Sequence, residues 1–137
     1  MRLITFIFVC SIGLSCTTTK KVTMPINILN GTWIPIKQEI GGKELPAVVL
    51  EKQKLIISDS TYTFIAESTD KGIVEYKDNK MDIYSKEGVN VGKHFTAIYK
   101  LENGLLTVCY NLAGDSYPDI FETQSKPTFF LSVFKKE

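Results

Sequence analysis

From Asn30 to the end of the chain, apolar and polar residues alternate in short runs, and each run stops at turn-forming residues. A period of two places one face of a strand against a core and the other toward solvent. No stretch keeps the 3.6-residue period of a helix, and only residues 46–53 could form a short helical turn, beginning at Pro46. The alternation predicts strands at residues 32–40, 54–58, 61–67, 72–76, 81–85, 94–101, 105–112 and 128–136.

The connections between these runs are short, which limits how the strands can be joined. Asn103-Gly104 separates two alternating runs and is a strong hairpin signal, because both residue types accept positive φ. Strands spaced in this way are typical of a β-sandwich or a barrel, and consecutive strands with short turns favour an antiparallel meander. About eight such strands can close into a small barrel, which also removes exposed strand edges. We therefore predict an all-β fold, a small antiparallel meander barrel of about eight strands.

The same alternation predicts which side chains point into the barrel. The inward set is Tyr62, Phe64, Val74, Tyr76, Met81, Ile83, Phe95, Tyr99, Leu106, Val108 and Phe130. Among its aromatic members, Tyr62, Phe64, Tyr76, Phe95 and Tyr99 are candidates to contact a small apolar ligand. These rings could line a cavity or fill it, and a domain of about 120 residues needs its large side chains in the core. We therefore expect a filled interior.

The N-terminal segment MRLITFIFVCSIGLSC has the pattern of an export signal. Arg2 supplies the positive charge, and the apolar stretch after it is shorter than the ~20 residues of a transmembrane helix. Cys16 resembles the acylated cysteine of a bacterial lipoprotein signal, with Gly13 at the place where the usual motif has leucine. Ordinary signal-peptidase cleavage after the small residues Gly13 and Ser15 remains the alternative.

This pattern divides the chain into three parts. We expect a lipoprotein signal peptide at residues 1–15, a polar tether at 16–28 and a barrel domain at 29–137. Acyl chains on Cys16 would hold the protein on a membrane, because each buried CH₂ contributes about 0.8 kcal/mol. The residue after the cysteine is Thr17 and not an acidic residue. By resemblance to lipoprotein sorting signals, this favours the outer membrane. The expected location is the cell envelope, as an outer-membrane lipoprotein on its periplasmic or surface face.

The start of the barrel domain carries a resemblance to a known fold family. The segment Asn30-Gly31-Thr32-Trp33 resembles the first conserved block of lipocalins, in which the tryptophan plugs one end of the barrel. The progression LNGTW, GGKELP, GKHFTAIYKLENGLLTVCYN and YPDIFETQSKPTFFLSVFKK, over residues 29–136, resembles the planctomycete-type uncharacterised small-domain family of lipocalin-like exported proteins. The resemblance implies a lipocalin-like barrel with Trp33 as its plug, and it implies no activity.

Charge excludes one class of partner. The chain has 16 Lys and Arg against 15 Asp and Glu, and its only Arg is Arg2 in the expected signal. Removing Arg2 leaves 16 − 1 = 15 Lys against the 15 acids, so the mature part is neutral. The lysines are scattered among acids, and no arginine remains to read guanine in a bidentate way. We expect no nucleic-acid partner.

Patterns for catalysis or metal binding are also missing. His94 is the only histidine, and we expect it at the surface or the barrel rim. Cys109 lies in an alternating run, which predicts a buried strand thiol and not a nucleophile. Asp115 and Asp119 bracket a Tyr-Pro pair in a loop that could fold over the barrel mouth, but their spacing is not that of a Ca²⁺ loop. We predict no enzyme activity, no metal and no cofactor.

Two functions fit these observations. The first is a monomeric lipoprotein that binds a small apolar or amphipathic molecule inside a lipocalin-like barrel. The second is an interaction or structural lipoprotein of the envelope, such as an inhibitor, an immunity factor or a scaffold, with a filled barrel. Its partner would bind at the long loops, for which the candidates are residues 41–49, 85–93 and 113–126, because scaffolds of this kind carry function in loops.

Overall fold

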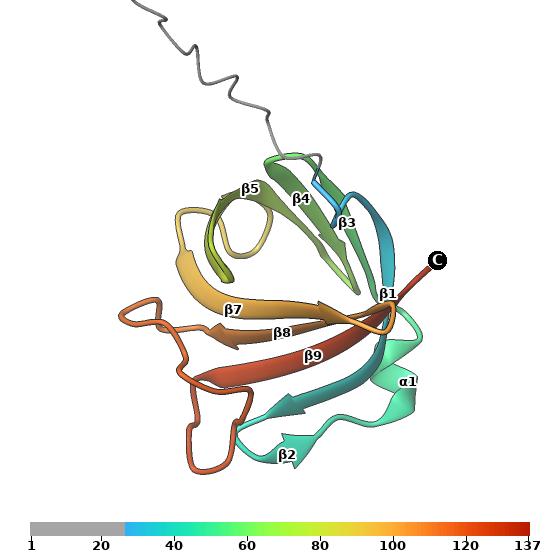
Figure 1. Cartoon of the computed structure of the whole chain (residues 1–137). Helices are drawn as coiled ribbons and strands as arrows, with labels where there is room; N and C mark the ends of the chain where they lie inside the picture. Colours follow the sequence, from blue (N-terminus) through green and yellow to red (C-terminus); the bar gives the residue numbers. More distant parts are fainter. Residues whose placement is uncertain (1–26) are drawn as a thin grey trace, which may run out of the picture.

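The computed structural model describes residues 27–137, and almost all of the regular structure in them is β-strand (Figure 1). The expected signal peptide, Cys16 and the tether up to residue 26 lie outside the described residues. The elements are β1 (Gly31–Ile40), β2 (Lys43–Glu44), α1 (Ala47–Leu50), β3 (Lys54–Ser58), β4 (Thr61–Ile65), β5 (Thr69–Lys77), β6 (Lys80–Glu87), β7 (His94–Glu102), β8 (Leu105–Asn111) and β9 (Phe129–Lys136).

The strands form one closed antiparallel sheet. Each of the strands from β3 to β8 pairs with the next strand along the chain, and β1 pairs with both β3 and β9. The two-residue strand β2 extends β1 at Ile40 and lies outside this ring. The ring therefore holds eight strands, β1 and β3 to β9, and the predicted all-β antiparallel meander barrel is confirmed.

Strand β1 divides into two parts. Its first residues pair with β3 as far as Trp33, and the register with β9 then shifts between Pro35 and Lys37. Proline has no N–H to give to a ladder, so a bulge is a favourable place for it. β1 has already left β3 where the bulge begins, and the predicted helical turn is present as α1 beside β1, with Leu50 buried (Figure 1). Between β1 and the segment that follows α1, the buried Gln38 amide donates to the side-chain oxygen of Gln53, at 2.6 Å.

One end of the barrel is closed by apolar packing. Leu29 and Trp33 are each 1 % exposed and belong to the main core cluster, where β1 begins and β9 ends. The Trp33 indole N–H donates to the Leu29 carbonyl at 2.8 Å, which gives the buried ring's one polar atom a partner. The ammonium of Lys136 lies over the same ring, 5.4 Å from its centre. We call this part of the molecule the closed end.

At the other end, the strands are joined by the longer connections, and we call this the open end. The β8–β9 connection, residues 112–128, packs against the outer wall of the barrel there, and of its residues only Leu112 lines the barrel interior. Its Tyr117 and Phe121 lie on a second apolar cluster made by Ile98, Cys109 and Leu131. The prediction that this loop could cover the mouth is therefore wrong, because its aromatic side chains find buried partners on the outside.

All eight predicted strands are present, with small shifts at their ends. The largest shift is at β5, which begins at Thr69, whereas the alternation predicted a strand from residue 72. Thr69 and Asp70, which read as turn residues, instead pair with Ile65 and Phe64 of β4. Between residues 27 and 137, no helix is long and apolar enough to cross a bilayer.

A candidate ligand cavity inside the barrel

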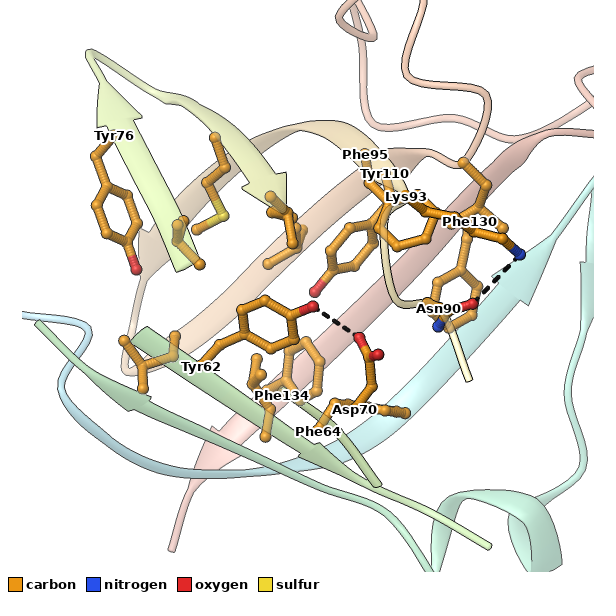
Figure 2. Close-up of a pocket in the computed structure, with 17 residues that line it drawn as sticks. Tyr62, Phe64, Asp70, Tyr76, Asn90, Lys93, Phe95, Tyr110, Phe130 and Phe134 are labelled. Atoms are coloured by element: carbon orange, nitrogen blue, oxygen red, sulfur yellow. Dashed lines mark hydrogen bonds between the residues drawn. The ribbon is translucent and has the colours of Figure 1, made fainter. Parts of the chain in front are cut away.

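The interior of the barrel holds a cavity of about 380 Å³. Its wall is mostly apolar and aromatic, and it includes Tyr62, Phe64, Val74, Tyr76, Ile83, Phe95, Val108, Tyr110, Phe130 and Phe134 (Figure 2). Lys93 and Leu112 also line it and are exposed to solvent, so the cavity reaches the surface at the open end. Its volume lies within the range of about 300–1,000 Å³ that small-molecule sites occupy.

The expectation of a filled interior is therefore wrong, and small inward residues explain why. The register places Gly72 beside Tyr62 and Ser85, and Ala97 beside Tyr110. Inward positions of β5, β6 and β7 carry glycine, serine and alanine, so these strands add less side-chain volume to the interior than strands that carry rings there. The Tyr62 ring lies over Gly72, and the volume that the remaining inward side chains leave unfilled is the cavity.

Four of the five predicted ligand contacts line this cavity. They are Tyr62, Phe64, Tyr76 and Phe95. The fifth, Tyr99, lies outside the lining and packs edge-on against the Tyr76 ring, with 6.0 Å between ring centres. Its hydroxyl donates to the Asp78 carbonyl at 3.1 Å, so it supports a turn and a neighbouring wall residue.

The cavity contains a buried carboxylate, that of Asp70, which is 6 % exposed. The hydroxyl of Tyr62 on β4 donates to one of its oxygens at 2.7 Å, as Figure 2 shows, and the hydroxyl of Ser85 on β6 donates to the other at 2.6 Å. Burial, and then the hydrogen bond to Asp70, raise the pKa of Tyr62 well above its ordinary value. The tyrosine therefore stays protonated and remains a donor at neutral pH.

Two glycines allow the carboxylate to lie here. A Cβ on Gly72 would meet the Tyr84 carbonyl oxygen at 2.0 Å and the Tyr62 ring at 2.9 Å, so only glycine lets that ring lie across β5. Gly88 has a φ of +103°, and a Cβ on it would meet the Thr69 carbonyl oxygen at 2.2 Å. The β6–β7 loop can therefore pack directly against the backbone that carries Asp70.

The remaining polar groups of the cavity lie toward its two ends. Figure 2 shows Tyr76 on one side and Asn90 with Lys93 on the other. The Tyr76 hydroxyl is buried and has no hydrogen-bond partner among the described residues. Burial raises the pKa of Tyr76 and of Tyr110, so both rings stay neutral. At the mouth, the Lys93 ammonium donates to the Asn90 side-chain oxygen at 3.5 Å.

The other residues that the sequence singled out lie outside the cavity. Cys109 is a buried strand thiol, as predicted, and burial raises its pKa to about 11. His94 is partly exposed on the outer wall, stacks on Tyr84 and lies 2.7 Å from an Asp82 carboxylate oxygen. Asp115 accepts a hydrogen bond from Asn111, and Asp119 is exposed in the β8–β9 loop. Over residues 27–137, no three His, Cys, Asp or Glu side chains gather closely enough to hold a metal ion.

Comparisons of the chain with protein-family models, with curated proteins and with solved structures found no match.

Asp70 and Ser85 are the site residues that sequence reasoning missed. Asp70 stands in Ser68-Thr69-Asp70, which reads as a turn because those residue types dominate turns. The signal that could have found it is the alternation itself. Counting back from the inward Val74 in steps of two reaches Gly72 and then Asp70, on the same face.

Proposed function

We propose that this protein is an exported, membrane-anchored lipoprotein whose lipocalin-like barrel binds a small molecule with a large apolar part and performs no catalysis. The observation that carries the proposal is the cavity of about 380 Å³, open at one end and lined mainly by aromatic and aliphatic side chains. Such a wall removes an apolar ligand from water, which contributes about 25 cal/mol per Å² of buried apolar surface. The few polar groups would orient the ligand.

The anchor and the family belong to the same proposal. The export pattern before Cys16 supports acylation at that cysteine and a place in the cell envelope, on the outer membrane. The Gly-Thr-Trp start and the order of motifs over residues 29–136 support membership of the planctomycete-type lipocalin-like family. The eight-stranded antiparallel barrel and the buried Trp33 agree with that assignment.

The cavity is tested by two neighbouring residues on β5 that point to opposite faces. Val74 is 4 % exposed and lines the cavity, whereas Ile73 is outside the lining. We expect Val74→Phe to fill the cavity and abolish binding of the uncharged fluorescent probe N-phenyl-1-naphthylamine. Ile73→Phe adds a ring of the same size on the other face and should keep it. If the probe bound both variants equally well, the cavity would not be the site.

A carried ligand is the direct evidence. Native mass spectrometry of the protein purified from its own envelope should show an added mass that disappears on organic extraction. That mass would also identify the chemical class of the ligand.

The anchor is tested by replacing one cysteine at a time. Cys16→Ala should release the protein from sedimented membranes, and Cys10→Ala, a change of the same kind inside the expected signal peptide, should leave it bound. Sedimentation of the Cys16→Ala variant with membranes would show that acylation there is not what holds the protein.

A second function, binding to a protein partner, is favoured by one observation. The β6–β7 loop exposes two apolar side chains, Val89 at 69 % and Val91 at 63 %. This loop is among those that the sequence predicted for a partner. Val89→Ser with Val91→Ser should then weaken capture of a partner while leaving probe binding to the cavity unchanged.

A further inference from the structure

The charge state of the cavity identifies one more property of its ligand. Asp70 is 6 % exposed, and its two hydrogen-bond donors, Tyr62 and Ser85, are both neutral. Among the described residues, the ion pairs are Lys54–Glu137, His94–Asp82 and Lys100–Glu102, and none of them involves Asp70. A buried carboxylate without a cation is costly, and two neutral donors compensate only part of its lost hydration.

The walls around Asp70 suit a cation better than an anion. The rings of Tyr62, Phe64, Phe95, Tyr110 and Phe130 line the same cavity. The face of an aromatic ring carries partial negative charge and attracts an ammonium or guanidinium group placed over it. An anionic head at this depth would instead meet the Asp70 carboxylate and these ring faces.

Lys93 does not compensate the carboxylate from within the protein. It is the one cation among the described residues that line the cavity, and it lies at the exposed mouth with its ammonium near Asn90. Figure 2 shows its nitrogen directed toward Asn90 and away from Asp70. The cavity therefore has a negative interior and a positive group at its rim.

We propose that the cavity selects amphipathic amines, with the ligand's cationic head against the Asp70 carboxylate and its apolar body along the aromatic wall. The proposal rests on the proposed function, since it requires the cavity to be a ligand site. Tyr62 and Ser85 hold the carboxylate in place, and each of its oxygens keeps a free lone pair for the ligand's N–H donors. An N⁺–H···O⁻ bond formed here is stronger than a neutral one because both groups carry charge, and burial away from water strengthens it further.

The test compares three ligands of equal length that differ only in the head group: decylamine, decanol and decanoate at pH 7. Each displaces N-phenyl-1-naphthylamine from the full chain. We expect decylamine to bind about 10-fold more tightly than decanol, as one charge-assisted bond to a buried partner predicts, with decanoate weakest. Because Val74→Phe should no longer bind the probe, its ligand binding is followed by thermal unfolding, and none of the three ligands should raise its melting temperature.

The matched variants are Asp70→Asn and Asp119→Asn. Asparagine keeps the shape of Asp70 and can still accept from Tyr62 or Ser85, but it removes the charge. We expect the preference for decylamine over decanol to fall to within about 3-fold in Asp70→Asn, with decanol affinity unchanged. Asp119 is exposed in the β8–β9 loop, so its variant should keep the full preference.

The outcomes separate the two proposals. If the probe does not bind and no ligand raises the melting temperature, the proposed function fails. If the probe binds and all three ligands displace it equally, the function stands and the amine preference is overturned. Tightest binding by decanoate would also overturn it, in favour of an anion held at Lys93. Should Asp70→Asn fail to fold, the order of the three ligands on the unaltered protein still decides.

Discussion

The two ends of this barrel are built in different ways. At the closed end, adjacent strands are joined by tight turns in which Asp59, Asp78 and Asn103 adopt positive φ, and Leu29 and Trp33 fill the space between the strands. At the open end, the connections are longer, and the buried groups include the Asp70 carboxylate and its two hydroxyl partners. Apolar packing therefore holds one end, and hydrogen bonds shape the other.

This difference separates stability from binding. Removing apolar volume from a packed end leaves a void that neighbours cannot fill, so the closed end should carry much of the folding free energy. The open end buries the Asp70 carboxylate and leaves a cavity unfilled. Both features lower stability, but they provide a place for a ligand. Changes at the closed end should affect stability first, and changes at the open end should affect binding first.

The largest effect is expected from Trp33→Ala. Its ring is 1 % exposed, and its N–H is bonded to the Leu29 carbonyl, so the change removes both packing and a buried hydrogen bond. We expect the free energy of unfolding, measured by urea denaturation, to fall by about 3–5 kcal/mol. At urea concentrations at which the variant is still folded, it should bind N-phenyl-1-naphthylamine as the unaltered protein does.

Trp33→Phe is the matched control, because it keeps an aromatic ring and loses the N–H. It should cost less than Trp33→Ala. An unchanged melting temperature for Trp33→Ala would show that the closed end does not depend on this residue. Loss of probe binding by the folded variant would show that the two ends are not independent.

The rate at which the Cys109 thiol is modified reports how often the wall beneath the β8–β9 loop opens. Burial raises the pKa of its thiol to about 11, so almost none of it is thiolate at pH 8. Compared with a free cysteine of pKa about 8.5, iodoacetamide should modify it at least ~100-fold more slowly. The rate is followed by mass spectrometry of the peptide that contains Cys109. A rate close to that of the urea-unfolded chain would mean that this wall opens readily and that the second apolar cluster is not stable.

Two glycines of the β6–β7 loop test how the open end shapes the site. Gly88 and Gly92 both have positive φ, but a Cβ would meet the Thr69 carbonyl at Gly88 and nothing within 4 Å at Gly92. Alanine at either position strains the backbone by about 1–3 kcal/mol. Only Gly88→Ala should also push the loop away from Asp70 and weaken probe binding. Equal binding by the two variants would show that the contact at Thr69 does not shape the site.

The closed barrel could be predicted from the sequence because its cause is local. Alternation and turn residues are read directly along the chain, and β3 has the predicted bounds, residues 54–58. Alternation alone can place Asp70 on the inward face but cannot give its hydrogen bonds, because its partners Tyr62 and Ser85 come from two other strands and only the register brings them together. The cavity also depends on several strands at once, since its wall is made by side chains from β3 to β9.

The smallest effect concerns the link between the β8–β9 loop and the outer wall. The Tyr117 hydroxyl donates to one carboxylate oxygen of Asp82, and the His94 ring lies at the other oxygen of the same carboxylate. Partial burial pushes the pKa of Asp82 up, but the hydrogen bonds from Tyr117 and His94 and the charge of His94 pull it down, and the net pKa is lowered. A carboxyl group with a lowered folded pKa stabilises the protein above its unfolded pKa of about 3.9, and this stabilisation is lost as pH falls through the folded pKa.

Asp82→Asn should therefore lower the free energy of unfolding by less than about 1 kcal/mol at pH 7, since both partners are partly exposed to solvent. The difference from the unaltered protein should shrink as pH falls below about 4, where the carboxyl is protonated first in the unfolded chain, and should disappear below the lowered folded pKa of Asp82. Urea denaturation at pH 7 and at pH 3 measures this difference. The control is Asp119→Asn, which changes an exposed residue of the β8–β9 loop and should show no such pH dependence. A difference that is equal at both pH values would mean that the charge of Asp82 does not hold the loop, which would then depend on the apolar contacts of Tyr117 and Phe121.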